Sequence, residues 1–267
     1  MKTHVEHFHF AGASRVSNRP SLVIFAAFAL VSGCGTTDAA APLLPTGPTG
    51  RLRFVNLTFD GDTTRGKLNA ILEGKPFGVD IAYGRSTPAF LPAPATSIYS
   101  SVYVGSRSLV LKRTSDSSVT VATVPLSISS GVDYTIYATG ASPVSSFITI
   151  DTNSAPIPGQ ARIRIVQMAP SAGIVDVFVT SVGADLSVAS ITLASLPYKG
   201  SAYLQPVAAG AYQVRVVPAG TLPSQRAMNI LLNLSTVTIA ANSARTIIAA
   251  DNNSGGAPLR FIALTDR

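Results

Sequence analysis

Two short stretches decide the fold: RLRFVN at residues 51–56 and RIRIVQ at residues 162–167. In both, Arg alternates with apolar residues, and a period of two is typical of a strand with one buried face and one face in water. We therefore expect four arginines to lie on a solvated face that also discourages edge pairing: Arg51, Arg53, Arg162 and Arg164. Each stretch is expected to open a domain.

Other segments recur between the same two parts of the chain. SGVDYTIY at 130–137 corresponds to ANSARTII at 241–248, and Phe-Ile at 147–148 corresponds to Phe-Ile at 261–262. The segment 153–159 contains Pro156 and Pro158, which is typical of a linker. The sequence therefore predicts two domains, at residues 51–157 and 158–267.

Within each copy the apolar runs are short and rich in Val, Ile, Thr and Tyr, and Gly, Pro, Ser or Asn separate them. This pattern predicts strands rather than helices. In the first copy we expect strands at 68–72, 97–104, 109–112, 119–124, 134–138 and 147–150. In the second we expect them at 174–180, 201–204, 212–217, 232–239, 245–249 and 259–264. The predicted fold class is all-β, with two tandem immunoglobulin-like antiparallel β-sandwiches; a closed barrel is the alternative.

The first 33 residues have the order of a secretory signal. Lys2, Arg15 and Arg19 precede an apolar run at 22–31, and small residues follow. Ten residues at about 1.5 Å each cannot cross a hydrocarbon core of roughly 30 Å, so this run is not expected to be a membrane span.

The stretch LVSGC at 30–34 resembles the lipobox of bacterial lipoproteins, and Cys34 is the only cysteine in the chain. The resemblance implies cleavage before Cys34 and attachment of a diacylglycerol to its sulfur, which makes the membrane a partner. Residues 34–50 are then the lipidated Cys and a flexible tether rich in Thr, Ala, Pro and Gly. Gly35 after the Cys implies an outer-membrane lipoprotein that faces the periplasm or the cell surface.

The composition removes several classes of chemistry. The chain is 46% hydrophobic and 12% charged, so it is not expected to be disordered, and one Cys excludes a disulfide scaffold. All three histidines, His4, His7 and His9, fall in the predicted leader. Ser-His-Asp and Cys-His nucleophiles and zinc sites made of His or Cys are therefore unavailable. We expect no catalytic residue, no cofactor and no metal.

The strand patterns resemble the bacterial domain of unknown function 4397. RIRIVQMAP at 162–170 is similar to its opening strand and Ala-Pro turn, and VDVFV at 175–179 is similar to a further strand. The first copy departs more, because residues 60–67 are inserted and Asn69 and Leu109 replace motif residues. The resemblance implies two tandem copies, a fold and an envelope setting, but no active site.

A few side chains are candidate ligand contacts. Asp176 lies in mid-strand between two valines, and we favour an outward-facing strand residue over a ligand group. Arg51, Arg53, Arg162 and Arg164 are candidates for contact with lipid phosphates or anionic polysaccharide, the alternative being the solvated face. Without interleaved aromatic residues they fall short of a nucleic-acid footprint, so no nucleic acid is expected. Five tyrosines are candidates for a carbohydrate platform, although packing explains them more simply: Tyr99, Tyr103, Tyr198, Tyr203 and Tyr212.

Residues 61–67, GDTTRGK, match most of a phosphate-binding loop, but Leu68 stands where the metal-binding hydroxyl is required. The neighbouring Asp60 and Asp62 leave a calcium loop open as an alternative to a solvated insertion.

The sequence thus predicts a lipid-anchored envelope protein that is a non-catalytic binding, adhesion or structural module. Envelope polysaccharide or another envelope protein is the expected partner. One alternative is a glycosidase-like hydrolase, in which two of four carboxylates converge to about 5–10 Å: Asp60, Asp62, Glu73 and Asp80. The other alternative is a passive spacer of the envelope.

Overall fold

The computed structural model describes residues 47–59, 66–88, 98–141, 143–152 and 154–266. Residues Leu43–Arg267 form one compact unit. The predicted leader, Cys34 and most of the tether lie outside the described residues, as do Asp60 and Asp62.

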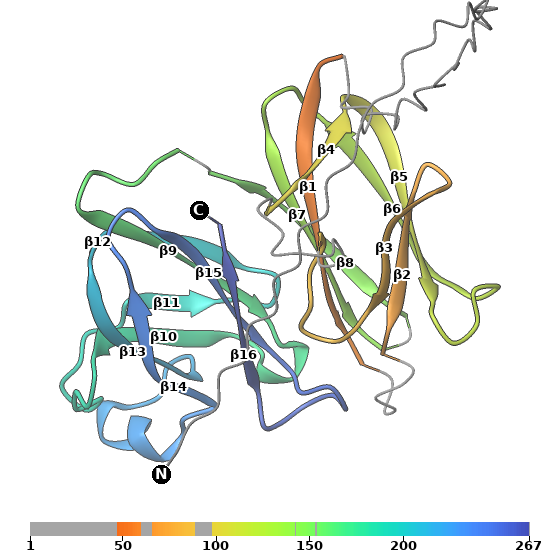
Figure 1. Ribbon diagram of the computed structural model, residues 1–267. Coiled ribbons are helices and arrows are strands. Elements are labelled where there is room, and N and C mark those ends of the chain that lie inside the picture. Colours follow the sequence, from red (N-terminus) through yellow and green to blue (C-terminus); the bar gives the residue numbers. More distant parts are fainter. Residues whose placement is uncertain (1–46, 60–65, 89–97, 142, 153, 267) are drawn as a thin grey trace, which may run out of the picture. The chain divides into compact units, whose positions relative to one another are not determined.

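The first half of the unit is a sandwich of two four-stranded sheets, in the orders β4-β1-β7-β8 and β3-β2-β5-β6 (Figure 1). Its strands are β1 (Thr49–Thr58), β2 (Leu68–Leu72), β3 (Lys75–Ile81), β4 (Ser100–Tyr103), β5 (Gly105–Arg113), β6 (Thr120–Ile128), β7 (Asp133–Gly140) and β8 (Ser145–Asp151).

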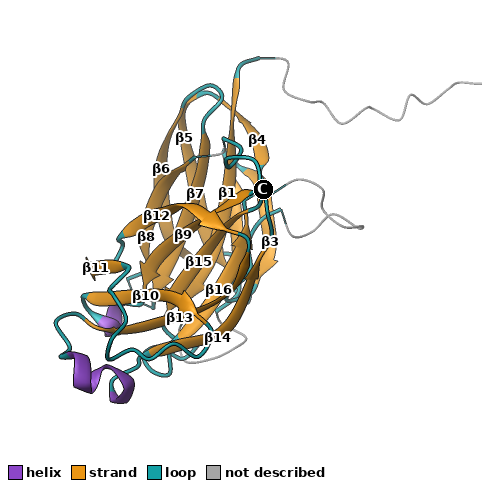
Figure 2. Ribbon diagram, turned by 90° about the vertical axis from the view of Figure 1, so that its left-hand side faces the viewer, coloured by secondary structure: helices purple, strands orange, loops and turns teal. Residues whose placement is uncertain are grey.

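The second half repeats this arrangement, with sheets in the orders β12-β9-β15-β16 and β11-β10-β13-β14. Its strands are β9 (Gln160–Met168), β10 (Val175–Ser181), β11 (Leu193–Leu196), β12 (Ser201–Ala208), β13 (Gly210–Pro218), β14 (Leu232–Ile239), β15 (Ala244–Ala250) and β16 (Arg260–Thr265). Two short 3-10 helices, η1 (Pro170–Ala172) and η2 (Pro223–Met228), lie in its loops (Figure 2). Strand for strand, β9 corresponds to β1, β12 to β4, and β15 to β7.

The prediction of an all-β sandwich fold is confirmed, and the predicted strands 68–72 and 232–239 match β2 and β14 at both ends. The expected domain boundary between residues 157 and 158 stays a prediction; it falls between the end of β8 and the start of β9.

The sheets are mostly antiparallel, as expected, but each half also contains one parallel pair. β1 pairs in parallel with β7, from Arg51 opposite Asp133 to Thr58 opposite Gly140, and β9 pairs in the same way with β15. In the first half the chain passes through the other sheet twice between these two strands, first as β2 and β3 and then as β5 and β6, and a parallel pair needs a long connection of this kind.

Two strands were missed. β3 contains Pro76, Gly78 and Asp80, three residue types that are depleted in strands. They are tolerated because β3 lies at the edge of its sheet, where one side of the strand has no partner strand. β11 has only four residues, LASL, none of them β-branched.

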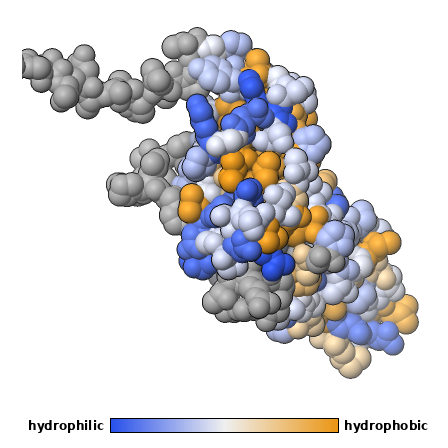
Figure 3. Space-filling view, turned by 90° about the vertical axis from the view of Figure 1, so that its right-hand side faces the viewer, coloured by the Kyte–Doolittle hydropathy of each residue, from blue (hydrophilic) through white to orange (hydrophobic). Residues whose placement is uncertain are grey.

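Each half has its own core. Leu52, Phe54 and Ile136 meet Leu109 and Leu111 of the opposite sheet in the first half. The second half buries the corresponding Ile163, Ile165 and Ile247 against β10 and β13. On the outside, apolar side chains are separated into small groups by hydrophilic ones on the face in Figure 3.

A third core joins the halves. Val55 and Leu57 of β1 pack in one cluster with Val166 and Met168 of β9. The alternate residues of β1, Leu52 and Phe54, lie in the core of the first half, so β1 is buried on both faces. The sheets that contain β1 and β9 therefore each contact the other half as well as their own partner sheet.

Among the described residues, no helix has the length and apolar character that a membrane crossing needs.

We expect Leu111→Ala, which empties a fully buried position, to lower the free energy of unfolding by about 2–5 kcal/mol. Val188→Ala is the matched control, because Val188 is 82% exposed, and it is expected to change stability by less than about 0.5 kcal/mol. Urea unfolding followed by circular dichroism measures both. Equal effects of the two substitutions would contradict the packing described above.

Candidate functional site

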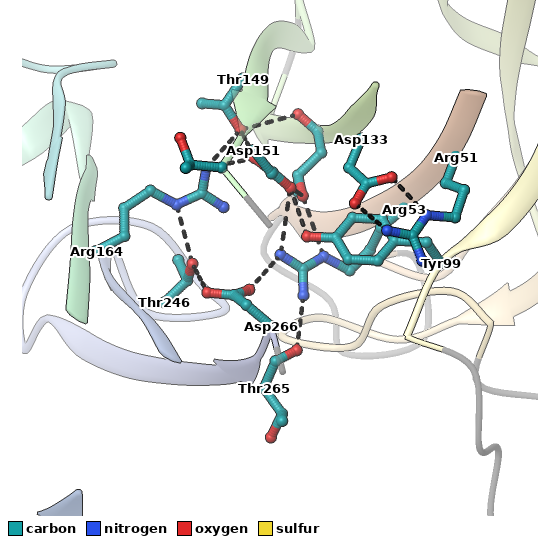
Figure 4. A network of polar contacts seen from close by, with 12 residues as sticks. Arg51, Arg53, Tyr99, Asp133, Thr149, Asp151, Arg164, Thr246, Thr265 and Asp266 are labelled. Atoms are coloured by element: carbon teal, nitrogen blue, oxygen red, sulfur yellow. Dashed lines mark hydrogen bonds and ion pairs between the residues drawn. The ribbon is translucent and has the colours of Figure 1, made fainter. Parts of the chain in front are cut away.

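A buried polar cluster lies where the two halves meet, and it contains two of the arginines that the sequence singled out (Figure 4). The Arg53 side chain is 2% exposed. Its Nε donates to Thr135 Oγ1 of the neighbouring strand β7 at 3.1 Å. Its Nη2 donates to Asp266 Oδ1, which belongs to the other half, at 2.8 Å.

Arg164 makes the corresponding contacts in the opposite direction. Its Nε donates to Thr246 Oγ1 of the neighbouring strand β15 at 2.9 Å. Its Nη1 donates to Asp151 of the first half, and the Arg164 side chain is 1% exposed. Each arginine thus holds a threonine of its own half and an aspartate of the other.

The threonines close the cluster. Thr135 Oγ1 donates to Asp151, and Thr246 Oγ1 donates to Asp266 Oδ2 at 2.7 Å. Asp266 accepts from one threonine of its own half and one arginine of the other, and Asp151 does the same and accepts in addition from Thr149 Oγ1 at 2.8 Å. The shared contacts are arranged as in an isologous dimer interface, here within one chain.

Two tyrosines cover the arginines. The Arg53 guanidinium lies 4.7 Å from the centre of the Tyr99 ring, and the Arg164 guanidinium lies 5.4 Å from that of Tyr203. Tyr99 also donates to Asp151 Oδ2 at 2.6 Å. Cation–π contacts of this kind are strongest when water is excluded.

The outer pair of arginines differs between the halves. Arg51 makes a bidentate ion pair with Asp133, at 2.6 and 2.5 Å, while its own side chain is 52% exposed. The residue that corresponds to Asp133 in the second half is Ala244, and Arg162 instead donates to Thr152 O and to Ser154 Oγ in the linker.

The expectation of a solvated arginine face was therefore wrong for Arg53, Arg162 and Arg164, which are buried. The reason is that this face of each sheet is covered by the other half. A role in ligand binding has not been tested for any of the four arginines, and the structure gives each an intramolecular partner.

Asp176 was expected to face outward, and this was also wrong. It is 4% exposed, and its two carboxylate oxygens accept from the backbone N–H groups of Ser195 at 2.8 Å and Gly220 at 3.1 Å. Ser195 has a φ of 53°, which L-residues rarely adopt. In the first half Asn69 Oδ1 accepts from the N–H of Asp80, whose φ is 54°, so both side chains hold a strained residue of the next strand segment.

The electrostatics of the cluster favour the ionised pair. Burial by itself raises the pKa of Asp151, but the charge of Arg164 and the hydrogen bonds to the carboxylate outweigh it and lower this pKa below its usual value. Burial lowers the pKa of Arg164, yet the nearby Tyr137 and Asp151 raise it above the ordinary value. Burial raises the pKa of Tyr137 to about 12. Arg164 and Asp151 are therefore charged at neutral pH, and Tyr137 is neutral.

Every acidic side chain that the structure describes has an intramolecular partner. Glu73 accepts from Ser108 N–H at 2.5 Å, and Asp80 pairs with Lys67 at 2.8 Å. The remaining acids and their partners are Asp116 with Ser118, Asp133 with Arg51, Asp151 with Arg164, Asp176 with Ser195, Asp185 with Ser187, Asp251 with Ser171 and Asp266 with Arg53.

Of the four carboxylates proposed for a hydrolase, Asp60 and Asp62 lie outside the described residues, as do the calcium loop that they suggest and most of the phosphate-loop match. Within the described part of the chain, no three His, Cys, Asp or Glu residues group as metal ligands would.

Sequence reasoning missed Asp151 and Asp266, which complete the cluster. A signal was present, because both copies end with an apolar strand followed by Asp, FITID at 147–151 and FIALTD at 261–266.

A groove in the first half is the remaining candidate site. It has a volume of about 510 Å³ and lies between β3 and β4, which are edge strands of opposite sheets. Two other cavities are smaller, at about 300 and 360 Å³.

Residues 75–178 match the model of a family described as Domain of unknown function (DUF4397). This is one copy, and it runs from β3 into β10, so it crosses the boundary at which the sequence analysis separated two copies. No curated protein matches the chain.

Two similar solved structures both have carbohydrate-binding titles. One, titled as α-glucan binding by a streptococcal virulence factor, is 10% identical, covers 77% of this chain and 95% of its own, and has a TM-score of 0.25. The other is a family CBM26 module of Eubacterium rectale Amy13K in complex with maltoheptaose; it is 12% identical, covers 80% and 95%, and has a TM-score of 0.24. Neither likeness is close enough to bear on the function of this chain.

We expect Arg164→Met to lower the free energy of unfolding by about 3–5 kcal/mol, because it leaves the Asp151 carboxylate buried without its cation. A double-mutant cycle with Asp151→Asn is expected to give a coupling energy of about 0.5–3 kcal/mol. The cycle of Arg53→Met with Asp266→Asn should give a similar value, because its geometry is equivalent.

The control is the pair of Lys67 and Asp80, whose side chains are 39% and 43% exposed, and for which about 0–1 kcal/mol is expected. If the coupling energies of the two buried pairs are no larger than that of this control, the ion pairs of the cluster do not stabilise the contact between the halves.

Stability should also depend on pH through Asp151. Its pKa in the folded chain lies below that in the unfolded chain, about 3.9, so the carboxylate stabilises the fold above that pH. This contribution is lost as the pH falls through the lowered pKa. Urea unfolding at pH 7 and below about pH 4 should therefore show a smaller acid-induced loss of stability in Asp151→Asn than in the wild type. The same loss in both chains would contradict the assignment.

Proposed function

We propose that the chain is a lipid-anchored, non-catalytic binding module of the bacterial cell envelope. The observation that carries the proposal is the pairing of every described acidic side chain within the protein itself. General acid–base catalysis needs a carboxylate or imidazole that is available to a substrate. The described residues contain no histidine, and the buried carboxylates Asp133, Asp151 and Asp176 are engaged by arginine or backbone N–H groups within the protein.

The anchor is proposed from LVSGC at 30–34 and the single Cys34. Two or three acyl chains on one residue hold a protein durably, whereas one chain gives only marginal binding. Twelve residues lie between Cys34 and Gly47, the first described residue, and the thirteen steps from one to the other span at most about 45 Å. Gly35 supports an outer-membrane location, and the binding surface would then stay within this distance of the bilayer.

We also propose that the family resemblance extends to a second tandem copy. The repeated strand order and the corresponding arginine, threonine and aspartate contacts support this duplication. The matched region itself is one copy.

The two rival functions make different demands. A hydrolase would need Glu73 or Asp80 to leave Ser108 or Lys67 and converge with another carboxylate. A passive spacer would need no binding surface, but the first half offers a groove large enough for a small ligand.

We expect the wild-type chain to be found in the membrane fraction of its host and Cys34→Ser in the soluble fraction, because Ser cannot receive the thioether-linked lipid. Immunoblots of the two fractions measure this. Thr36→Ala, which keeps the thiol, is the control and should stay with the membrane. Retention of Cys34→Ser on the membrane would refute the anchor, and protease treatment of intact cells would separate a surface from a periplasmic orientation.

A further inference from the structure

The groove of the first half has an apolar floor at the open edge of the sandwich. Leu72 and Phe77 line it from the β2–β3 hairpin, and Val102 lines it from β4. The hairpin turns through Glu73 and Gly74, both with positive φ, at 49° and 75°. A turn of this kind matches the twist of the strands, so this wall of the groove is well defined.

An exposed aromatic ring forms part of the opposite wall. Tyr103 is 47% exposed. Every other aromatic side chain in the described part of the chain is buried or half-buried. The other tyrosines considered for a carbohydrate platform are buried or half-buried, as Tyr99 and Tyr203 illustrate. An exposed tyrosine ring in the same lining as apolar side chains suits a ligand that has flat apolar faces and polar edges.

The rim of the groove is positive. Arg107 Nε donates to Tyr103 O at 3.1 Å and its Nη2 donates to Val104 O at 2.8 Å, which holds the guanidinium against the main chain at the end of β4. Lys75 lies exposed on the opposite side. The one carboxylate of the lining, Glu73, accepts from Ser108 N–H, so two cations face one carboxylate that is already engaged.

The second half lacks this combination at the corresponding place. Tyr103 pairs with Thr49 at the start of the first half, and Ala208 pairs with Gln160 at the start of the second. Tyr212 donates to Ala208 O, where Arg107 donates to Tyr103 O. Both halves therefore have a side-chain hydrogen bond to the carbonyl group at this position. In the second half, however, Ala208 stands in the place of Tyr103, and the donor is the uncharged Tyr212 instead of Arg107.

We propose that the groove between β3 and β4 binds an acidic oligosaccharide, with a sugar ring stacked on Tyr103 and carboxylates of the sugar paired with Lys75 and Arg107. A pyranose ring has the apolar faces and polar edges that the walls require, and charge complementarity selects an acidic one. The inference deepens the proposed function, on which it rests, by giving the binding module a site and a ligand class.

A saccharide fits better than an extended peptide. Peptides that bind to a sheet edge do so through main-chain hydrogen bonds with the edge strand. At this end of β4 the carbonyl groups of Tyr103 and Val104 already accept from Arg107.

The test is calorimetry on the wild-type chain purified in detergent, with a trimer of galacturonic acid as the acidic probe and maltotriose as the neutral one. We expect the acidic trimer to bind more tightly, with an affinity that falls as salt is added. Tyr103→Ala, which copies the second half, should weaken binding of the acidic trimer about tenfold or more. Lys75→Gln should weaken the same binding roughly threefold to tenfold and leave any maltotriose binding unchanged.

Matched controls are Val188→Ala, an exposed apolar residue of the second half, and Lys112→Gln, a lysine of β5 outside the groove. Both should bind like the wild type. Absence of binding to the acidic trimer, equal binding of both trimers, or wild-type affinity of Tyr103→Ala would each overturn the groove proposal. Membrane fractionation of Cys34→Ser and an assay for new reducing ends test the broader function separately, so the two can fail independently.

Discussion

The exchange of arginines and aspartates between the halves is the interaction on which the rest of the structure depends. A guanidinium removed from water is costly unless a carboxylate and further hydrogen bonds replace the lost hydration. Arg53 finds its carboxylate on Asp266, and Arg164 finds its carboxylate on Asp151. The nearest carboxylate of each arginine thus lies on the other half, although Arg53 is also 3.7 Å from Asp151 of its own half, so burial of both arginines is coupled to the contact between the two sheets. The apolar cluster around Val55 and Val166 also stabilises the contact, but burial of apolar surface is non-directional. The ion pairs have a defined geometry, so they fix how the two sheets are aligned.

The two halves share this joint and differ at their surfaces. The corresponding contacts of Arg53 and Arg164 agree down to the nitrogen that bonds the threonine. At the open edge of each sandwich the residues differ instead, with Tyr103 in one half and Ala208 in the other. The two halves thus agree in the contacts that join them and differ at the edges that face solvent.

The strands could be predicted because their signal is local. Alternation of apolar and polar residues, as in LNLSTVTI of β14, identifies a strand whatever it packs against. What covers a strand is not local, and for this reason the arginine face was misassigned. Val55 and Leu57 share that face with Arg53 in β1, and this apolar continuation was the available sign that the face is buried. Asp176 was misjudged for the same reason, since its partners are backbone groups of Ser195 and Gly220, which no strand pattern reveals.

The sequence distance between Arg53 and Asp266, 213 residues, has a consequence for how the protein is made. A chain synthesised from its N-terminus completes the first sandwich long before Asp266 exists. Until then one sheet of that sandwich lacks the half that covers it. Its open face exposes the charge of Arg53 and the apolar side chains of Val55 and Leu57 to solvent. Such half-finished surfaces are where multidomain proteins aggregate or pair wrongly. The first half therefore keeps Arg53 on an uncovered sheet until the chain has been extended as far as Asp266 and the second half has folded against it.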